Sequence, residues 1–338
     1  MSTAPAPIAP ALSAGTLLQT AALVAGTQHF PLATLYVVAT PIGNLADFSL
    51  RAIHVLSLVD AVACEDTRVS GGLMRHLGLD KPLIALHEHN EQSAAHKVLE
   101  RLARQQRVAY VSDAGTPAVS DPGALLVAMA RAAGHRVLPL PGPSSVVAAL
   151  SAAGDVGPAG GGRGFHFAGF LPSRGAERQS ALAAALLQAC ATVLFEAPHR
   201  IASLFDSLAR ACPQRAVTVC RELTKQFEQI ETLAAGALPA WLAADPQRHK
   251  GEFVLVLHAP PAVAAESGLP AASLRQLEIL LRELPLKQAV ALAAELSGAP
   301  RNALYQHALA LRSAAGNLAG QADEQEEPLE AEEPKELG

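Results

Sequence analysis

Residues 107–123 read RVAYVSDAGTPAVSDPG, an apolar run that passes into a loop of small, turn-forming residues. Val108 to Val111 is short and apolar with β-branched and aromatic members, which predicts a buried strand that ends at Ser112. The loop from Asp113 to Gly123 is followed by an apolar run of helical period. A loop of this kind at the carboxyl end of a strand is where open α/β sheets bind ligands.

Three further apolar strands end in loops that contain proline. These strands and loops are Leu35 to Ala39 with Thr40 to Leu45, Val137 to Leu140 with Pro141 to Ser145, and Thr192 to Phe195 with Glu196 to Arg200. For any one loop, proline and glycine can simply mark a turn from strand to helix. The set of loops favours a shared, rigid crevice at one edge of a sheet.

Short apolar strands and amphipathic helices alternate along most of the chain, and we expect Asp47 to cap one of these helices. Repeated β-α units over residues 35–154 predict a parallel sheet with helices on both faces. A Gly-rich linker at 155–164 then leads to a second α/β domain at 165–259, whose later strands we expect to be antiparallel. The predicted fold class is therefore α/β with two domains, one sheet parallel and the other mixed.

The two ends of the chain differ in composition from its middle. We predict a flexible extension over residues 1–34, which has no basic start and no apolar run of membrane-spanning length. A second linker at 260–270 precedes a small bundle of three short helices at 271–313, and the acidic tail 314–338 is predicted to be disordered.

Composition restricts the class of partner and the compartment. The 338 residues are 50% hydrophobic and only 4% aromatic, which argues against a protein that stacks nucleic-acid bases on aromatic rings. The net charge is −5, but residues 321–338 carry eight acidic residues and one lysine, so the rest of the chain is weakly positive. The four cysteines have no C-x-x-C spacing, which predicts reduced thiols and, without a secretory signal, a cytoplasmic protein.

Several familiar ligand motifs are missing from the sequence. It has no G-x-x-x-x-G-K-[ST] and no G-x-S-x-G, and Thr40 to Asn44 replaces the G-x-G-x-x-G of a dinucleotide site. His87-Glu88-His89-Asn90 follows a strand, yet no residues at a recognised metal spacing accompany it. We interpret it as a polar turn near a cleft and predict no metal site.

Charged residues gather where strands end. Glu65-Asp66-Thr67-Arg68 follows a strand and opens a helix; its acids could complement the helix dipole or serve a ligand, and both readings stay open. Basic side chains at strand ends are usually solvated. Several of them along one rim of a cleft would instead contact the phosphates of a nucleic acid. These residues are Arg51, Arg68, Arg75, Arg174, Arg178, Arg200 and Lys225.

Six motifs in order resemble the ribosomal RNA small subunit methyltransferase I family, a branch of the tetrapyrrole methylase superfamily. They are Val38 to Leu45, Glu65 to Arg68, Ser112 to Gly123, Pro141 to Ser144, Phe195 to Arg200 and Cys220 to Lys225. The resemblance runs from about Leu35 to His258, and the helix at Lys287-Gln288-Ala289 also resembles the family's C-terminal part.

The resemblance implies a two-domain homodimer that binds S-adenosylmethionine between its domains and methylates the ribose 2′-hydroxyl of a cytidine in the decoding region of 16S ribosomal RNA. Gly115-Thr116-Pro117 stands where the tetrapyrrole-modifying relatives have G-D-P, which favours the RNA branch. The implied cofactor contacts are Pro41, Ile42, Gly115, Thr116, Pro117, Val119, Ser120, Ser144, Ser145, Leu171, Glu196 and Ala197.

Transfer of a methyl group to a hydroxyl also requires a general base that accepts the hydroxyl proton. The candidates are Glu65, Asp66, Glu88 and Glu222. Our hypothesis places Asp66 and Arg68, with Glu65, near the acceptor as catalytic residues. For the RNA we expect contacts from Arg51, Arg174, Arg178, Arg200 and Lys225. Two alternatives remain: a methylase of a tetrapyrrole or other small molecule with the same cofactor, and a non-catalytic RNA- or ribosome-binding module.

Overall fold

The computed structural model describes residues 13–157, 164–260, 269, 271–309 and 311. The chain divides into two compact units, Met1–Pro261 and Ala262–Gly338. The acidic tail 314–338, most of the two predicted linkers and the first twelve residues lie outside the described ranges. Among the helices within those ranges, none combines the length and the apolar composition needed to cross a membrane.

The first sheet is wholly parallel, as its sequence pattern predicted, and has the strand order β3-β2-β4-β1-β5. Its central strands are apolar on both faces, which is typical of strands covered by helices on both sides. All four residues of β2 and of β4 are buried. The strands are β1 (Thr34–Val38), β2 (Ala61–Cys64), β3 (Leu83–Ala85), β4 (Val108–Val111) and β5 (Arg136–Leu140).

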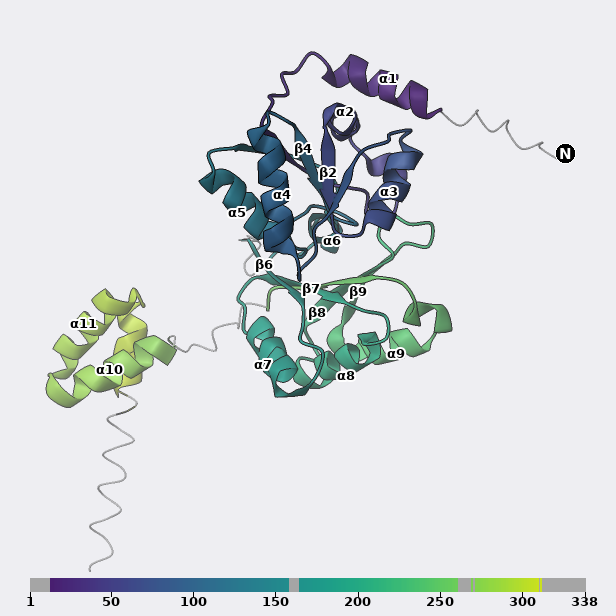
Figure 1. The fold of residues 1–338 in the computed structure, drawn as a ribbon. Coiled ribbons are helices and arrows are strands. Elements are labelled where there is room, and N and C mark those ends of the chain that lie inside the picture. The colour runs from purple at the N-terminus through teal and green to yellow at the C-terminus, as the bar shows by residue number, and fades with distance from the viewer. Residues whose placement is uncertain (1–12, 158–163, 261–268, 270, 310, 312–338) are drawn as a thin grey trace, which may run out of the picture. The chain divides into compact units, whose positions relative to one another are not determined.

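Helices follow these strands, as Figure 1 shows. The expected cap Asp47 lies instead in the short 3-10 helix η1, and Ser49 caps α2 by accepting a hydrogen bond from the Ala52 amide at 3.1 Å. A serine directly before the first helical residue can reach this amide, whereas Asp47 comes too early. The elements are η1 (Leu45–Asp47), α2 (Leu50–Leu58), α3 (Thr67–His76), α4 (Glu91–Ala103), α5 (Ala124–Ala132) and α6 (Ser145–Ala153).

Part of the predicted flexible extension is a helix. The helix α1 (Ala14–Ala25) is capped by Ser13 and packs on α2, where Figure 1 also places it. Ala21 and Ala25 are buried one turn apart, and Ala21 joins the core of the first sheet. The alanines of this segment provide both helix propensity and a small face for close packing.

The second sheet is mixed, with the order β6-β7-β10-β8-β9. The strands β6 and β7 are parallel, and the remaining pairs are antiparallel, which confirms the prediction for the later strands. The strands are β6 (Phe165–Phe170), β7 (Ala191–Glu196), β8 (Ala216–Arg221), β9 (Gln229–Ala234) and β10 (Phe253–Leu257). The helical segments are α7 (Gly175–Leu186), α8 (Ile201–Ala211), η3 (Ala235–Ala237), α9 (Leu238–Ala243) and η4 (Pro246–His249).

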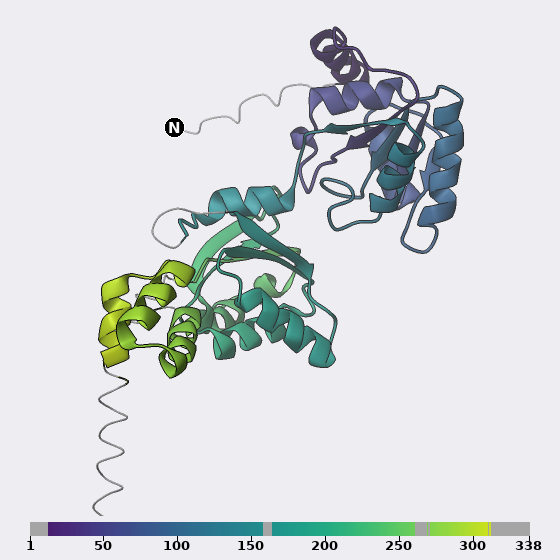
Figure 2. The ribbon, with the colours of Figure 1, turned by 90° about the vertical axis from the view of Figure 1, so that its left-hand side faces the viewer.

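The helix α6 packs on the second sheet, although we expected it to complete the first domain. Its buried residues Val146, Ala149 and Ala153 share a core cluster with Val193 of β7 and Val256 of β10. Figure 2 shows the helix along this sheet. The sequence correctly predicts a helix at residues 145–153, but nothing local to these residues specifies which sheet the helix covers.

The C-terminal unit is a small helical bundle, as predicted. The helices α10 (Ala271–Glu283) and α11 (Leu286–Ser297) are followed by helical residues 301–309. Leu277, Val290 and Leu304, one from each helix, are buried together in its core.

Candidate functional site

The loops after β1, β4 and β5 are joined directly to one another at the carboxyl edge of the first sheet. Thr40 and Gly115 exchange backbone hydrogen bonds of 2.9 and 3.0 Å. The Thr116 hydroxyl donates to the carbonyl oxygen of Pro143 at 3.0 Å. These three loops therefore form one rigid wall at one edge of the first sheet, as predicted. The fourth loop, Glu196 to Arg200, follows β7 of the second sheet and not this edge, although Glu196 to Pro198 line the same cavity.

A cavity of about 390 Å³ lies against this wall, a volume within the range of small-molecule sites. Residues of the second sheet complete it, so the cavity is built from both halves of the Met1–Pro261 unit. The lining residues are Ile42, Asp113, Ala114, Gly115, Thr116, Val119, Ser120, Asp121, Ser144, Ser145, Val146, Phe170, Phe195, Glu196, Ala197, Pro198, Leu223, Glu252, Phe253 and Val254.

Most of the expected cofactor residues line this cavity. They are Ile42, Gly115, Thr116, Val119, Ser120, Ser144, Ser145, Glu196 and Ala197. Pro41, Pro117 and Leu171 do not line it; Leu171 is buried, and its carbonyl oxygen accepts a hydrogen bond of 2.7 Å from Arg200. Sequence reasoning did not select Asp113 and Asp121, although both lie in the loop on which it was based. It also missed Glu252 to Val254, because the sequence around them has no motif typical of a binding loop.

Unusual backbone conformations concentrate near the cavity. Gly115 has φ +83°, and a Cβ atom there would lie 3.3 Å from Ile42 Cγ2. Ala118, Glu222 and Thr224 have φ values of 61°, 55° and 66°, which side-chain-bearing residues seldom adopt. Such conformations persist when the surrounding structure enforces them, and they often occur at binding sites.

Three carboxyl groups at the ends of β2 and β4 have raised pKa values. Burial is the main cause for Glu65, Asp113 and Asp121, and the charge of Asp113 further raises the pKa of the other two. Asp113 and Asp121 line the cavity, whereas Glu65 does not. This part of the cavity is therefore acidic, and its two aspartates are partly buried.

The proposed catalytic pair Asp66 and Arg68 lies beside the cavity rather than in its lining. Asp66 caps α3, and Arg68 Nη2 lies 2.6 Å from its Oδ2 atom. The hydrogen bonds from Arg68 lower the pKa of Asp66 to about 2, so this carboxylate is a weak base. The Arg68 side chain itself is 90% exposed. The catalytic roles of Glu65, Asp66 and Arg68 stay predictions.

Glu196 lies at the end of β7 with a fully buried side chain between two arginines. Arg178 Nη2 is 2.6 Å from Oε2, and Arg200 Nε is 2.6 Å from Oε1. The same arginines donate to the carbonyl oxygens of Pro172 and Leu171 at 3.1 and 2.7 Å. Both were expected to contact RNA, but their side chains here hold Glu196 and the loop after β6 in place.

The other expected RNA contacts have different surroundings. Lys225 bridges Glu222 and Glu252, with its Nζ atom 2.9 and 3.1 Å from their carboxylate oxygens. Arg174 is exposed at the start of α7, and Arg51 is half-buried on α2. Their contacts with RNA stay predictions.

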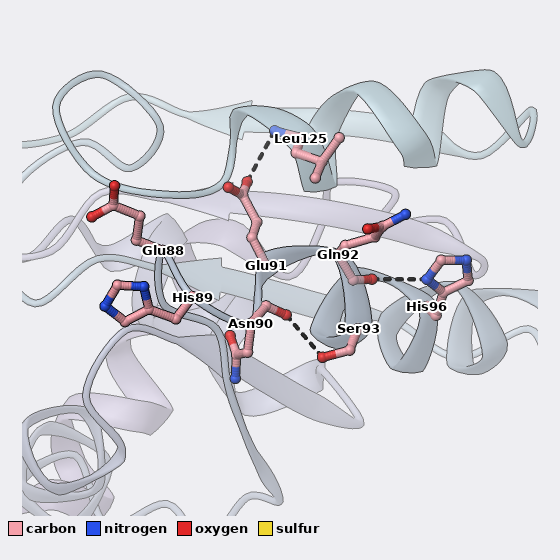
Figure 3. A pocket seen from close by; sticks show the side chains of 8 residues that line it. All are labelled: Glu88, His89, Asn90, Glu91, Gln92, Ser93, His96 and Leu125. Atoms are coloured by element: carbon pink, nitrogen blue, oxygen red, sulfur yellow. Dashed lines mark hydrogen bonds between the residues drawn. The ribbon is translucent and has the colours of Figure 1, made fainter.

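A second, open cavity of about 550 Å³ lies at the start of α4, as Figure 3 shows. Asn90 of the His87 to Asn90 motif is used within the turn: its side chain accepts from the His87 amide at 2.8 Å and donates to the Ala85 carbonyl oxygen at 3.1 Å. Glu91 accepts from the amides of Gly123 and Leu125 at 2.8 and 3.0 Å. Within the described ranges, no group of His, Cys, Asp and Glu side chains is arranged to hold a metal ion.

Comparison with known proteins relates this chain and its fold to methylases. A family model described as "Tetrapyrrole (Corrin/Porphyrin) Methylases" matches residues 34–239, and one described as "RsmI C-terminal HTH domain" matches residues 267–312. Among solved structures, a diphthine synthase matches with a TM-score of 0.51 at 15% identity, covering 67% of this chain and 90% of its own. The cobalt precorrin-4 methyltransferase has a TM-score of 0.50 at 18% identity, with coverages of 66% and 94%. At these identities the likeness concerns the fold alone.

Relatives of much higher identity are known. The "Ribosomal RNA small subunit methyltransferase I" of Escherichia coli O157:H7 is 47% identical over 81% of this chain and 94% of its own length. The protein of the same name from Pseudomonas aeruginosa is 46% identical, covering 82% and 96%. With both the methylase region and the C-terminal bundle matched, the chain belongs to the ribosomal RNA small subunit methyltransferase I family and is a methyltransferase of tetrapyrrole methylase fold.

Proposed function

We propose that this enzyme transfers a methyl group from S-adenosylmethionine to the ribose 2′-hydroxyl of a cytidine in the decoding region of 16S ribosomal RNA. The observation that supports the proposal is the cavity beside the joined loops after β1, β4 and β5. Relatives of the chain are named as methyltransferases of small-subunit ribosomal RNA. Gly115 and Thr116 line this cavity, and they belong to the Gly115-Thr116-Pro117 triplet at which the sequence departs from the tetrapyrrole-modifying relatives.

The residues of the cavity fit S-adenosylmethionine. Gly115 and Ile42 form a close cradle in which a larger side chain would meet Ile42. Phe170 and Phe195 pack edge to face, 5.4 Å between ring centroids, and present apolar and aromatic surface to the cavity. Ser144 precedes α6 without using its side chain as a cap, so its hydroxyl is not engaged with that helix end. This mixture of aromatic surface, hydroxyls and acids suits a ligand with a base, a ribose and a positive charge.

S-adenosylmethionine supplies a methyl group on a positively charged sulfur. The chain's own residues then have three tasks: to hold donor and acceptor in line, to exclude water, and to receive the hydroxyl proton. Rigid positioning alone can lower such a barrier by about 7 kcal/mol or more. The joined loops after β1, β4 and β5 are suited to this task because hydrogen bonds connect them to one another.

Exposed cations near the cavity would position the RNA through its phosphates. Arg68 follows β2 with its side chain in solvent, and Arg174 is exposed at the start of α7. The C-terminal bundle matches a family model described as a helix-turn-helix domain, a motif known for nucleic-acid contact. We infer that the RNA contacts are largely electrostatic and carry little base specificity. The implied homodimer stays a prediction, which the mass of the protein in solution would test.

We expect the purified enzyme to transfer labelled methyl groups to small ribosomal subunits from cells that lack its gene, and mass spectrometry to place a single ribose methyl on a cytidine. RNA binding should weaken steeply as salt rises, because each phosphate contact releases condensed counterions. Transfer to a tetrapyrrole and not to RNA would favour the small-molecule alternative. If calorimetry detected no binding of S-adenosylmethionine, only the non-catalytic module would remain.

A further inference from the structure

Methylation of a ribose hydroxyl needs a group that accepts its proton, and four carboxylates line the cavity: Asp113, Asp121, Glu196 and Glu252. Glu196 is held between two arginines at 2.6 Å each, so its charge is already neutralised. The side chain of Glu252 is 78% exposed and lies 3.1 Å from Lys225 Nζ. Asp113 and Asp121 are therefore the acids best placed to receive a proton within the cavity.

The structure distinguishes these two aspartates by how they are held. Asp113 directly follows Ser112 at the end of β4, and its Oδ1 atom accepts a hydrogen bond of 3.1 Å from the backbone amide of Asp66. This bond fixes the carboxylate at the end of β2, where the exposed Arg68 also lies. Asp121 lies further along the same loop, and its pKa is raised as well, so the two aspartates differ in the hydrogen bond from the Asp66 amide, which Asp113 alone accepts. Asp113 is thus the acid fixed toward the end of β2, where the exposed guanidinium of Arg68, paired with Asp66, could meet an RNA phosphate.

We infer that Asp113 is the general base of the methyl transfer, and this inference rests on the proposed function. The 2′-oxygen forms a bond to the methyl carbon while the carbon–sulfur bond breaks and leaves its electron pair on sulfur. The hydroxyl proton passes to the Asp113 carboxylate and from there to water. Asp66 serves as a positioning residue, because its amide holds Asp113 while its own carboxylate is paired with Arg68.

The surroundings of Asp113 suit this task. Its burial raises its pKa above the ordinary 3.8, which makes the carboxylate a stronger base, while the amide of Asp66 opposes that rise. The titratable and charged groups that interact with Asp113 are Cys64, Glu65, Asp66, Arg68 and Asp121. Glu196 and Glu252, from β7 and from the residue before β10, line the same cavity.

The test compares Asp113→Asn with Glu100→Gln, the same loss of charge on an exposed position of α4. Asparagine keeps the oxygen that accepts from the Asp66 amide. We expect Asp113→Asn to lower kcat on small ribosomal subunits by about a hundredfold or more, with the calorimetric Kd for S-adenosylmethionine within about threefold of wild type. Glu100→Gln should match wild type in both kcat and Kd.

The pH profile gives a second test. The kcat of wild type should fall as pH is lowered through the raised pKa of Asp113, whereas the kcat of Asp113→Asn should show no such fall on the acidic side of its profile.

Stability gives a readout that needs no substrate. A carboxyl whose pKa is higher in the folded than in the unfolded state stabilises the fold at low pH and loses this contribution as pH rises through the folded pKa. The Tm of Asp113→Asn should therefore equal or exceed that of wild type at pH 7, and the difference should vanish toward pH 4.

Each other outcome overturns the assignment in a distinct way. Near-wild-type kcat in Asp113→Asn, or loss of the acidic limb in Asp121→Asn instead, would remove Asp113 as the base. Weakened S-adenosylmethionine binding, including a variant that fails to fold and bind, would make it a cofactor ligand or a structural residue. If wild type itself transferred no methyl to ribosomal subunits, the proposed function would fail and not this assignment alone.

Discussion

Replacing Glu196 with glutamine should destabilise the second sheet by about 3 kcal/mol, at the lower end of the range for breaking a buried ion pair. The Glu196 side chain is fully buried, and its arginine partners are only 12% and 20% exposed. Glutamine has the same shape but no charge, and its amide group would place donors against the donors of Arg178. Two poorly solvated guanidinium groups would then lack their counter-charge.

Urea unfolding followed by Trp241 fluorescence measures this effect. Trp241 is the chain's only tryptophan, and it lies in the core that α9 shares with the second sheet. Glu252→Gln is the matched control, since it removes an ion pair with Lys225 whose acid is 78% exposed and should change stability by less than about 1 kcal/mol. Equal losses in the two variants would contradict a special role for the buried Glu196.

The same substitution should also weaken S-adenosylmethionine binding. Glu196 and Ala197 line the cavity, and the arginines held by Glu196 donate to the loop after β6. The ion-pair cluster thus connects β7, α7 and that loop into one support for this side of the cavity, where we propose that the cofactor binds. Leu171, expected to touch the cofactor, contributes to this support through its carbonyl oxygen while its side chain is buried.

Local sequence predicted the parts of the site that depend on local structure. A strand such as Val108 to Val111 is marked by its own apolar residues, and the loop after it by its own Gly, Pro and Asp. Parallel pairing then brings such loops to one edge, which is why Gly115 and Ser144 could be expected at one cavity.

The features that sequence reasoning missed depend on contacts between distant segments. Arg178 and Glu196 pair only because α7 and β7 pack in one particular relative position. The spacing of the two residues in the sequence does not predict that position. The helix α6 has a clear apolar face, but the choice between two sheets is made by tertiary packing. Our inference that Asp113, and not Asp66, is the general base likewise rests on burial and pairing, which a motif does not reveal.

Replacing Gly43 with alanine should weaken S-adenosylmethionine binding by about tenfold or more. Gly43 lies in the loop after β1, next to the cavity-lining Ile42, and packs against the loop after β8. A Cβ atom there would lie 2.5 Å from Lys225 Cγ, 2.8 Å from Thr224 Oγ1 and 2.9 Å from the Leu223 carbonyl oxygen. The lysine side chain could move aside, but the carbonyl oxygen belongs to backbone that must shift.

That shift reaches the cavity because Leu223 lines it and its neighbours are conformationally restricted. Glu222 and Thr224 already have positive φ values of 55° and 66°, so this loop has few alternative conformations in which to absorb the displacement. Overpacking of this kind costs about 1–3 kcal/mol, which corresponds to roughly five- to 150-fold in affinity when the displaced residues form the binding site.

Calorimetric titration with S-adenosylmethionine measures the loss, and Gly72→Ala is the matched control. Gly72 lies within α3, and a Cβ atom there would meet only Arg75 Nη2, at 4.0 Å. This control should bind the cofactor as wild type does and gain stability, because alanine favours a helix over glycine by about 0.5–1 kcal/mol. Unchanged affinity in Gly43→Ala would mean that the loop after β8 moves freely and is not a fixed wall of the site. The contact between the loops after β1 and β8 would then have no part in holding the donor, and positioning would rest on the hydrogen-bonded loops of the first sheet.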